Sequence, residues 1–199
     1  MKLIIASNNK SKIREYTGLF KIFPNIITMS LKDFPDYTPD EETGETLEEN
    51  AIHKAEHAAE ALGEWVIADD SGISVPALNG DPGIYSARYS GVNATDRKNN
   101  IKLLSAMKDF ENFERSAAFE CCIALAMPQG TLKKCVTGRC EGTICAEEHG
   151  GNGFGYDPIF IMHNHKRTFA ELDETTKNRI SHRSKAFEKI LMVIEALRL

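Results

Sequence analysis

Adjacent carboxylates after an apolar segment are the first candidates for chemistry in this sequence. Asp69 and Asp70 directly follow residues 66–68, which are predicted to form a short buried strand. Successive side chains of a strand point to opposite faces, so one carboxylate can face a ligand while the other is tied into the scaffold. Strand ends are typical ligand positions in α/β proteins. Two adjacent aspartates at such a place are hard to explain as ordinary surface residues.

A second acidic stretch, Asp40-Glu41-Glu42, lies in a polar loop predicted over residues 32–45. Loops of that length inside compact domains are often functional. Magnesium prefers hard oxygen ligands and usually takes one or two carboxylates from a protein, with water and phosphate supplying the rest. The two acidic stretches together could therefore supply a magnesium site. Taken alone, Glu41 or Glu42 is more typical of solvated loop charge.

The segment SNNKSK, residues 7–12, is a candidate phosphate site because it lies between a predicted strand and a predicted helix. Backbone N–H groups at a helix N-terminus lie in a positive dipole field, which suits phosphate. Lys12 could add a full charge, and the side chains of Ser7 and Asn9 could add hydrogen bonds. The glycines of a P-loop are missing. For this segment alone, an ordinary capped helix with solvated lysines is the more common interpretation.

Isolated basic residues carry weaker signals. Lys54 lies inside a predicted helix, and Arg88 lies in a loop bounded by glycine and proline. Each could neutralise phosphate charge, but a solvated surface residue is the simpler explanation of either one.

The sequence GFGYDP, residues 153–158, places two glycines around an aromatic residue. Glycine allows close backbone approach, and the ring face of Phe154 could stack on a base. The pattern is not a dinucleotide-binding fingerprint, because its glycines precede a strand instead of opening a helix. A tight turn with Phe154 anchored in the core explains the motif equally well.

Lys177 and the sequence SHR, residues 181–183, lie at the start of the last predicted helix. His and Arg donors placed side by side can bind the acceptor edge of a base. Ser181 as a helix N-cap with two solvated neighbours is a strong competing interpretation.

Length and charge bound the classes of protein that fit. The chain has 199 residues, of which 42% are hydrophobic, and this suits one domain or one domain divided into two lobes around a cleft. With 24 basic and 29 acidic residues its formal net charge is −5. Nucleic-acid binders normally carry a concentrated positive surface, so nucleic acid is not an expected partner.

Targeting signals and cysteines point to the cytoplasm. The N-terminal apolar run covers only residues 3–6, which is too short for a signal peptide, and no other stretch is long enough to span a bilayer. The five cysteines are odd in number and form no C-x-x-C pair. We therefore expect reduced thiols in a cytoplasmic protein without a structural zinc site or a membrane partner.

Strands and helices are predicted to alternate along the chain. Helices are expected from the stripe of Ile13, Tyr16 and Phe20, over residues 46–62 with a capping box at Thr46, over 95–107, and from about 181 to the end. Strands are predicted over residues 2–6, 25–29, 66–68, 117–127, 132–145 and 159–162. The fourth and fifth strands are joined by a short turn and predict a hairpin. The fold class expected is α/β, a mixed sheet flanked by helices.

Six segments together resemble the inosine triphosphate pyrophosphatase family, and in particular its bacterial dITP/XTP pyrophosphatase branch. They are ASNNKSKIRE, EETGETLEENAIHKA, ADDSG, PGIYSARYSG, GFGYDPIF and SHR. They follow the family's order and spacing from Leu3 to near Lys185. The family often begins its first motif with Thr-Gly-Asn, where this chain keeps a hydroxyl at Ser7 but has Asn8 in place of glycine.

The resemblance implies a fold and an activity. The implied fold is an elongated, two-lobed α/β fold with a long central mixed β-sheet flanked by helices, one domain over residues 1–199, and an active-site cleft between the lobes. The implied reaction is magnesium-dependent hydrolysis of ITP, dITP and XTP to the monophosphate and pyrophosphate, which removes non-standard purine nucleotides from the pool. A homodimer is also implied.

Matching the motifs position by position implies roles for individual residues. Asp70 would be the catalytic base, with Ser71 beside the substrate, and Glu42 and Asp70 would hold Mg²⁺. The triphosphate would be bound by Ser7, Asn8, Asn9, Lys10, Ser11 and Lys12. The base and sugar side would be lined by Phe154, Gly155, Tyr156, Asp157, Lys177, His182 and Arg183. Lys54 and Arg88 match positions that are basic in relatives, which implies phosphate contacts.

Two alternatives stay open. One is a Maf-like nucleotide pyrophosphatase that acts on modified pyrimidine or standard nucleotides, although the SHR and GFGYD motifs argue against it. The other is a non-catalytic nucleotide sensor, which would leave Glu42, Asp69 and Asp70 without a role.

Overall fold

The computed structural model describes residues 1–197, which form two compact units. The first unit comprises residues 1–70, 121–138 and the described residues from Arg183 on, and the second comprises residues 71–120 and 139–182. Six strands form one sheet in the order β2-β1-β3-β4-β5-β6. Because this sheet contains both parallel and antiparallel pairs, the predicted mixed α/β class is confirmed.

The parallel part of the sheet belongs to the first unit. β1 (Lys2–Ile5) pairs in parallel with β2 (Ile27–Ser30) and with β3 (Trp65–Ser74). Parallel neighbours need crossover connections, which α1 (Lys10–Phe20) and α2 (Leu47–Leu62) supply. β2 begins later than predicted, because the Ile26 N–H donates to the Phe23 carbonyl in a turn before the strand starts.

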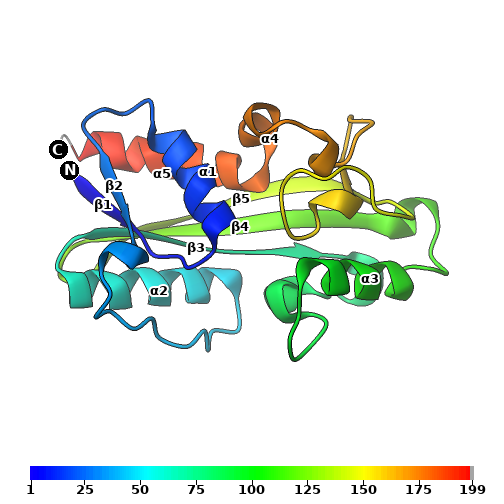
Figure 1. Ribbon diagram of the computed structural model, residues 1–199, viewed down its shortest axis with the longest axis horizontal. Coiled ribbons are helices and arrows are strands. Elements are labelled where there is room, and N and C mark those ends of the chain that lie inside the picture. Colours follow the sequence, from blue (N-terminus) through cyan, green and yellow to red (C-terminus); the bar gives the residue numbers. More distant parts are fainter. Residues whose placement is uncertain (198–199) are drawn as a thin grey trace. The chain divides into compact units, whose positions relative to one another are not determined.

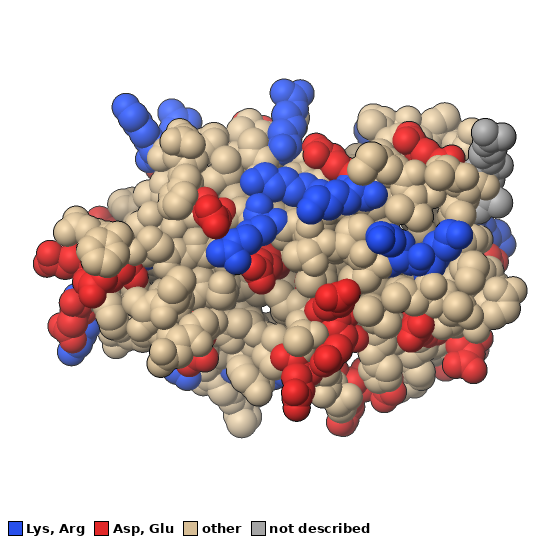
Figure 2. All heavy atoms as spheres, turned by 180° about the vertical axis from the view of Figure 1, so that it is seen from behind, with Lys and Arg blue, Asp and Glu red and all other residues tan. Residues whose placement is uncertain are grey.

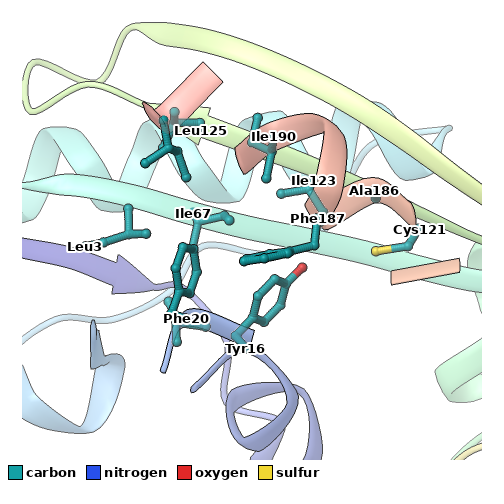
Figure 3. Packing of buried hydrophobic residues seen from close by; sticks show 12 residues of the cluster. Leu3, Tyr16, Phe20, Ile67, Cys121, Ile123, Leu125, Ala186, Phe187 and Ile190 are labelled. Carbon is teal, nitrogen blue, oxygen red and sulfur yellow. The ribbon is translucent and has the colours of Figure 1, made fainter. Parts of the chain in front are cut away.

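Alternating side chains of these strands build two cores, one on each face. Leu3, Ile5 and Ile67 join the core that Tyr16 and Phe20 of α1 share with α5 (His182–Ala196). The opposite face packs its apolar side chains against the alanines of α2. Figure 1 shows α1 and α5 on one side of the strands and α2 on the other, and Figure 3 shows the rings of Tyr16 and Phe20 turned into the first core.

The predicted ends of α2 are confirmed. The Thr46 hydroxyl accepts the Glu49 N–H at 3.0 Å, and Gly63 adopts a left-handed backbone with φ 65° just past the last turn. The capping box is not reciprocal, because the Glu49 carboxylate accepts the N–H of Glu45 at 2.8 Å instead of that of Thr46.

β3 is longer than predicted, which corrects the expected position of the two aspartates. They lie inside a strand of 10 residues and do not close it. The prediction ended the strand early because Asp and Gly are depleted in strands. Within the second unit Gly72 is needed for close packing, since a Cβ there would collide with the carbonyl oxygen of Gly83. The side chain of Ile73 is fully buried just beyond it.

The long strands β4 (Ser116–Ala126) and β5 (Leu132–Ile144) contribute to both units, and the second unit contains residues 116–120 of β4 and 139–144 of β5. It also contains β6 (Phe160–Met162), which pairs antiparallel with β5. Its helices are α3 (Asp96–Ala106) and α4 (Glu174–Ile180), of which α4 was not predicted. The short 3-10 segments of the chain are η1 (Leu31–Asp33), η2 (Pro76–Leu78), η3 (Gly83–Arg88), η4 (Asn112–Arg115), η5 (Asp157–Ile159) and η6 (Phe169–Glu171).

Three features of the described chain concern the expectations about membrane spans, cysteines and surface charge. Across residues 1–197 no helix combines the length and the apolar character that a membrane span requires. All five cysteines are free thiols. On the face drawn in Figure 2, acidic side chains accompany the basic ones.

Candidate active site

A buried charge cluster in the first unit is formed by Lys12, Glu15, Asp69 and Arg183. The Arg183 guanidinium donates to Asp69 Oδ2 from Nη2 at 3.0 Å and from Nε at 3.2 Å, and to Glu15 Oε2 from Nη1 at 2.6 Å. The Lys12 Nζ lies 3.1 Å from the same Asp69 oxygen. The Arg183 and Asp69 side chains are each 1% exposed, so the attraction acts where water screens it little.

The cluster fixes the charge of Asp69. Burial by itself raises the pKa of a carboxyl, but the neighbouring charges of Lys12 and Arg183 outweigh it and hold the pKa of Asp69 well below its ordinary value. Asp69 therefore stays ionised, and it ties α1, β3 and α5 together.

Asp70 points to the opposite face of β3, toward α2, as the strand alternation predicted. Its Oδ2 accepts the Asn50 side-chain N–H at 3.1 Å, and its Oδ1 lies 3.5 Å from Lys54 Nζ. Burial raises the pKa of Asp70, with Glu42 and Asp69 adding to the rise and Lys54 opposing it. The two adjacent carboxyls thus have pKa values moved in opposite directions by their surroundings.

Glu42 and Asp70 both contact the ammonium of Lys54. The Lys54 ammonium donates to Glu42 Oε1 at 2.8 Å while it lies 3.5 Å from Asp70 Oδ1. Burial lowers the pKa of Lys54, but the attraction of Asp70, Asp69 and Glu42 raises it overall. Carboxylates from the two acidic stretches therefore come together around one cation, on the α2 face of the first unit.

Asn50 is a site residue that the sequence reasoning missed. Its side chain is 1% exposed, donates to Asp70 and accepts the Gly44 N–H at 2.9 Å, so it joins the loop that carries Glu42 to β3. Gly44 permits this approach, since a Cβ there would lie 2.7 Å from Asn50 Oδ1. The available signal was the spacing of Asn50 and Lys54, four residues apart on a helix otherwise lined with alanine.

The chemistry of this donor set fits a magnesium ion. Among residues 1–197 no group of three or more His, Cys, Asp and Glu side chains could hold a metal by itself. Magnesium does not require such a group, because one or two carboxylates with water and phosphate oxygens complete its shell. Glu42 and Asp70 offer hard oxygen donors that already share a cation, the Lys54 ammonium.

In the predicted phosphate segment, residues 7–12, some of the backbone N–H groups at the start of α1 already donate hydrogen bonds to side chains of the segment. Asn9 is the N-cap of α1, and its Oδ1 accepts the N–H groups of Ser11 at 2.9 Å and Lys12 at 3.1 Å. The Ser7 hydroxyl accepts the Asn9 N–H at 3.2 Å. Asn9 thus shapes the segment. Asn8 and Lys10 are exposed, whereas the Lys12 side chain is 13% exposed and its ammonium contacts Asp69.

The glycine loop, residues 153–157 of the second unit, is held by the carboxylate of Asp157. Asp157 Oδ2 accepts the Phe154 N–H at 2.9 Å and the Lys177 ammonium at 2.6 Å. The Lys177 Nζ also lies 4.6 Å from the centroid of the Phe154 ring, a cation–π contact. Lys177 and Asp157 are both buried, and Gly153 must lack a Cβ because one would collide with Asp157 Oδ2. The structure thus brings together three predicted base-side residues.

Three further predicted residues of the second unit have separate surroundings. Tyr156 is buried, and its hydroxyl donates to the Ser86 carbonyl at 2.8 Å. The His182 ring stacks on Phe119 with centroids 4.6 Å apart and planes 7° apart. Arg88 is exposed at the end of η3, with its guanidinium 5.2 Å from the Tyr85 ring centroid.

Arg183 differs most from its predicted surroundings. It was expected beside the base together with His182, but its side chain lies in the buried charge cluster of the first unit. The prediction missed this because Glu15 and Asp69, the partners of its guanidinium, lie 168 and 114 residues away in the sequence. Ser71 follows Asp70 in β3 and is half-buried.

The structure is therefore that of an α/β protein with a mixed sheet. Its strand β3 carries two adjacent carboxylates, Asp69 and Asp70, and each lies beside a lysine. The sequence pattern of the Ham1 family matches residues 3–193, and the chain belongs to this family. The dITP/XTP pyrophosphatase of Protochlamydia amoebophila is 51% identical over 199 residues, which are 100% of both chains.

Solved structures agree with this assignment. The HAM1 protein of Coxiella burnetii matches with a TM-score of 0.88 at 42% identity, over 98% of this chain and 99% of that chain. The nucleoside-triphosphatase / dITP/XTP pyrophosphatase of Mycobacterium abscessus matches with a TM-score of 0.77 at 40% identity, over 96% of this chain and 99% of that chain.

Proposed function

We propose that this chain hydrolyses the non-standard purine nucleoside triphosphates ITP, dITP and XTP at the α–β phosphoanhydride bond. The products are the nucleoside monophosphate and pyrophosphate, and the reaction removes these nucleotides from the pool. The relative from Protochlamydia amoebophila, identical at 51% of positions over both full chains, carries the name dITP/XTP pyrophosphatase.

One observation carries the proposal: Asp69 and Asp70 are neighbours in β3, yet their pKa values are moved apart. The pKa of Asp69 is lowered and that of Asp70 is raised. Adjacent titratable groups with opposed environments are typical of acid–base sites. Lys12 beside the first and Lys54 beside the second supply the positive charge that a triphosphate requires.

In the proposed reaction, Asp70 holds a water molecule and accepts its proton while the oxygen attacks the α-phosphorus in line. The bond between the α-phosphorus and the bridging oxygen breaks, and pyrophosphate leaves. Asp69 keeps its charge and orients Lys12, whose ammonium neutralises the phosphate tail together with residues 7–11. Because phosphoryl transfer needs little covalent work from a protein, positioning and electrostatics would supply most of the rate enhancement.

Magnesium is the proposed cofactor, with Glu42 and Asp70 as its protein ligands. When bound, it would draw negative charge from the phosphates and stabilise the leaving pyrophosphate. Asn50 would keep the two ligands together, since it hydrogen-bonds both the Asp70 carboxylate and the loop that carries Glu42. Lys54 would then be free to turn from the carboxylates to a phosphate oxygen.

The second unit would bind the base. Phe154 would stack on the purine, Lys177 and Asp157 would fix the loop, and His182 with nearby backbone would donate hydrogen bonds. Hypoxanthine and xanthine present a 6-keto acceptor, whereas the 6-amino group of adenine would leave such donors unpaired, at about 1–3 kcal/mol each. Guanine shares the 6-keto group, so its rejection must depend on how C2 is accommodated. Ser71 and Arg88 are proposed contacts of the sugar and phosphates.

Two further predictions concern the context of the enzyme. A cytoplasmic location stays a prediction from the number and spacing of the cysteines. A homodimer stays a prediction from the family resemblance, and sedimentation analysis of the purified chain tests it.

The proposed function is tested by incubating the purified chain with magnesium and ITP, XTP, dITP, GTP or ATP in ¹⁸O-labelled water. We expect monophosphate and pyrophosphate from the first three nucleotides, with the label in the monophosphate, because water attacks the α-phosphorus. Diphosphate and orthophosphate would show that another bond is cleaved. Binding without turnover would favour the nucleotide sensor, and a preference for modified pyrimidines would favour the Maf-like alternative.

A further inference from the structure

An exposed carboxylate outside the predicted site is attached to the glycine loop. Asp96 Oδ2 accepts the Gly155 N–H at 2.7 Å, although the two residues are 59 positions apart. Asp96 is the first residue of α3, but the N-cap of that helix is Thr95, whose hydroxyl accepts the Lys98 N–H at 3.3 Å. The contact with Gly155 is therefore additional to what the helix start requires.

Gly155 lies where the backbone of the loop must be fixed if Phe154 is to hold one orientation. The residue has a left-handed φ of 61°, a conformation that glycine adopts without strain. The preceding N–H, that of Phe154, donates to Asp157 at 2.9 Å. Two consecutive N–H groups are thus held by two carboxylates, one inside the loop and one from α3.

The same helix also holds a second segment of this unit. The Asn99 side chain, buried one turn after Asp96, donates to the carbonyls of Ser86 and Ala87 at 3.2 Å each, and accepts the Ser90 N–H at 2.8 Å. These contacts fix the backbone on both sides of Arg88. α3 is therefore a common support for the two loops to which base and phosphate contacts are assigned above.

We infer that Asp96 is a positioning residue for nucleotide binding, which fixes the Gly155 N–H and thereby the plane of the Phe154 ring. The inference rests on the proposed function, because it assigns Phe154 to the base. Asp96 itself touches neither the substrate nor the reacting atoms.

The expected effect is on affinity. The base is remote from the bond that is cleaved, so an interaction that holds the base acts equally in the ground state and the transition state and changes KM, not kcat. Removal of a strong hydrogen bond to a charged acceptor should raise KM for ITP roughly ten-fold, which corresponds to about 1.4 kcal/mol. The affinity for inorganic tripolyphosphate, which has no base, should not change.

The test compares three variants of the full chain with the wild type. Asp96→Ala removes the acceptor, Asp96→Asn keeps an oxygen that can accept the Gly155 N–H, and Thr95→Ala weakens the start of the same helix without touching the loop. We expect Asp96→Ala to raise KM for ITP about ten-fold and Asp96→Asn about three-fold, with kcat and tripolyphosphate inhibition unchanged. The amide proton resonance of Gly155 should move upfield in Asp96→Ala, because its hydrogen bond to the carboxylate is lost. It should not move in Thr95→Ala.

Three outcomes would overturn the inference. The first is equal KM values for Asp96→Ala and Thr95→Ala, which would make Asp96 part of the helix alone. The second is a fall in kcat together with weaker tripolyphosphate inhibition, which would indicate general loss of structure. The third is an unchanged Gly155 resonance in Asp96→Ala. A wild-type chain that releases no pyrophosphate from ITP would instead refute the proposed function, and the base-side role would fall with it.

Discussion

The buried charge cluster of the first unit and the glycine loop of the second unit hold functional side chains in opposite ways. In the cluster, Arg183 joins Glu15 and Asp69 across 168 and 114 sequence positions, with almost no exposure of the side chains. In the loop, Asp157 holds the N–H of Phe154 only three positions away, and the exposed Asp96 holds that of Gly155.

The difference indicates what each region can tolerate. Charges that are removed from water and paired with one another make folding and catalysis depend on the same residues. A loop held by single hydrogen bonds to its backbone can lose one of them and keep its fold, so that affinity changes first. We therefore expect substitutions in the cluster to affect stability and kcat, and those around the loop to affect KM.

The largest effect is expected for Arg183→Met, which removes the buried guanidinium that pairs with the carboxylates of both Glu15 and Asp69. The free energy of unfolding should fall by about 3–5 kcal/mol, the usual result of breaking a buried ion pair. Urea denaturation measures it. The control is Arg139→Met, whose half-exposed pair with Glu120 at 2.6 Å should contribute less than about 1 kcal/mol. Equal losses in the two variants would contradict the role given to burial.

Asp70→Asn is expected to lower kcat for ITP on the order of 10²-fold, because the amide keeps the shape of the side chain and loses its basicity. Steady-state release of pyrophosphate measures the change, and circular dichroism checks the fold. Asp109→Asn, at a position whose side chain is 83% exposed, serves as the matched control. Turnover close to that of the wild type would remove Asp70 from the role of base.

Phe154→Leu should raise KM for ITP roughly ten-fold with kcat preserved, because stacking on an aromatic ring contributes about 1–3 kcal/mol per base. Phe154→Trp should retain the low KM. Phe113→Leu, at an 83% exposed position of the same unit, is the control and should change neither constant. If the loss appears in kcat instead, Phe154 does not act on the base side.

The smallest effect is expected for Asn9→Ala, which removes the N-cap of α1. Stability should fall by about 1 kcal/mol, as for other lost caps, and Thr95→Ala at the start of α3 should cost a similar amount. Asn9→Ala should lower kcat/KM for ITP more than Thr95→Ala does. The Asn9 Oδ1 accepts the N–H of Lys12, a predicted phosphate contact, whereas the Thr95 hydroxyl accepts that of Lys98, which is not a predicted site residue. Thermal and urea denaturation with parallel kinetics distinguish them.

Much of the fold followed from local patterns. The cap at Thr46 and the left-handed Gly63 bound α2 as predicted, because caps depend on a few neighbouring residues. The opposite orientation of Asp69 and Asp70 followed from strand geometry alone. The helix α4 was missed although Asp173 caps it, because its 7 residues are too few to show an apolar stripe.

The sequence by itself determined the family resemblance, the alternation of strands and helices, and the kinds of side chain available for binding phosphate, metal and base. Only the tertiary structure decided that β3 continues through its two aspartates, that Arg183 turns to Glu15, and that Asn50 joins Glu42's loop to Asp70. The physical reason is desolvation. A residue's type sets its charge, but its pKa and its partner depend on which distant side chains exclude water from it, and that follows only from packing.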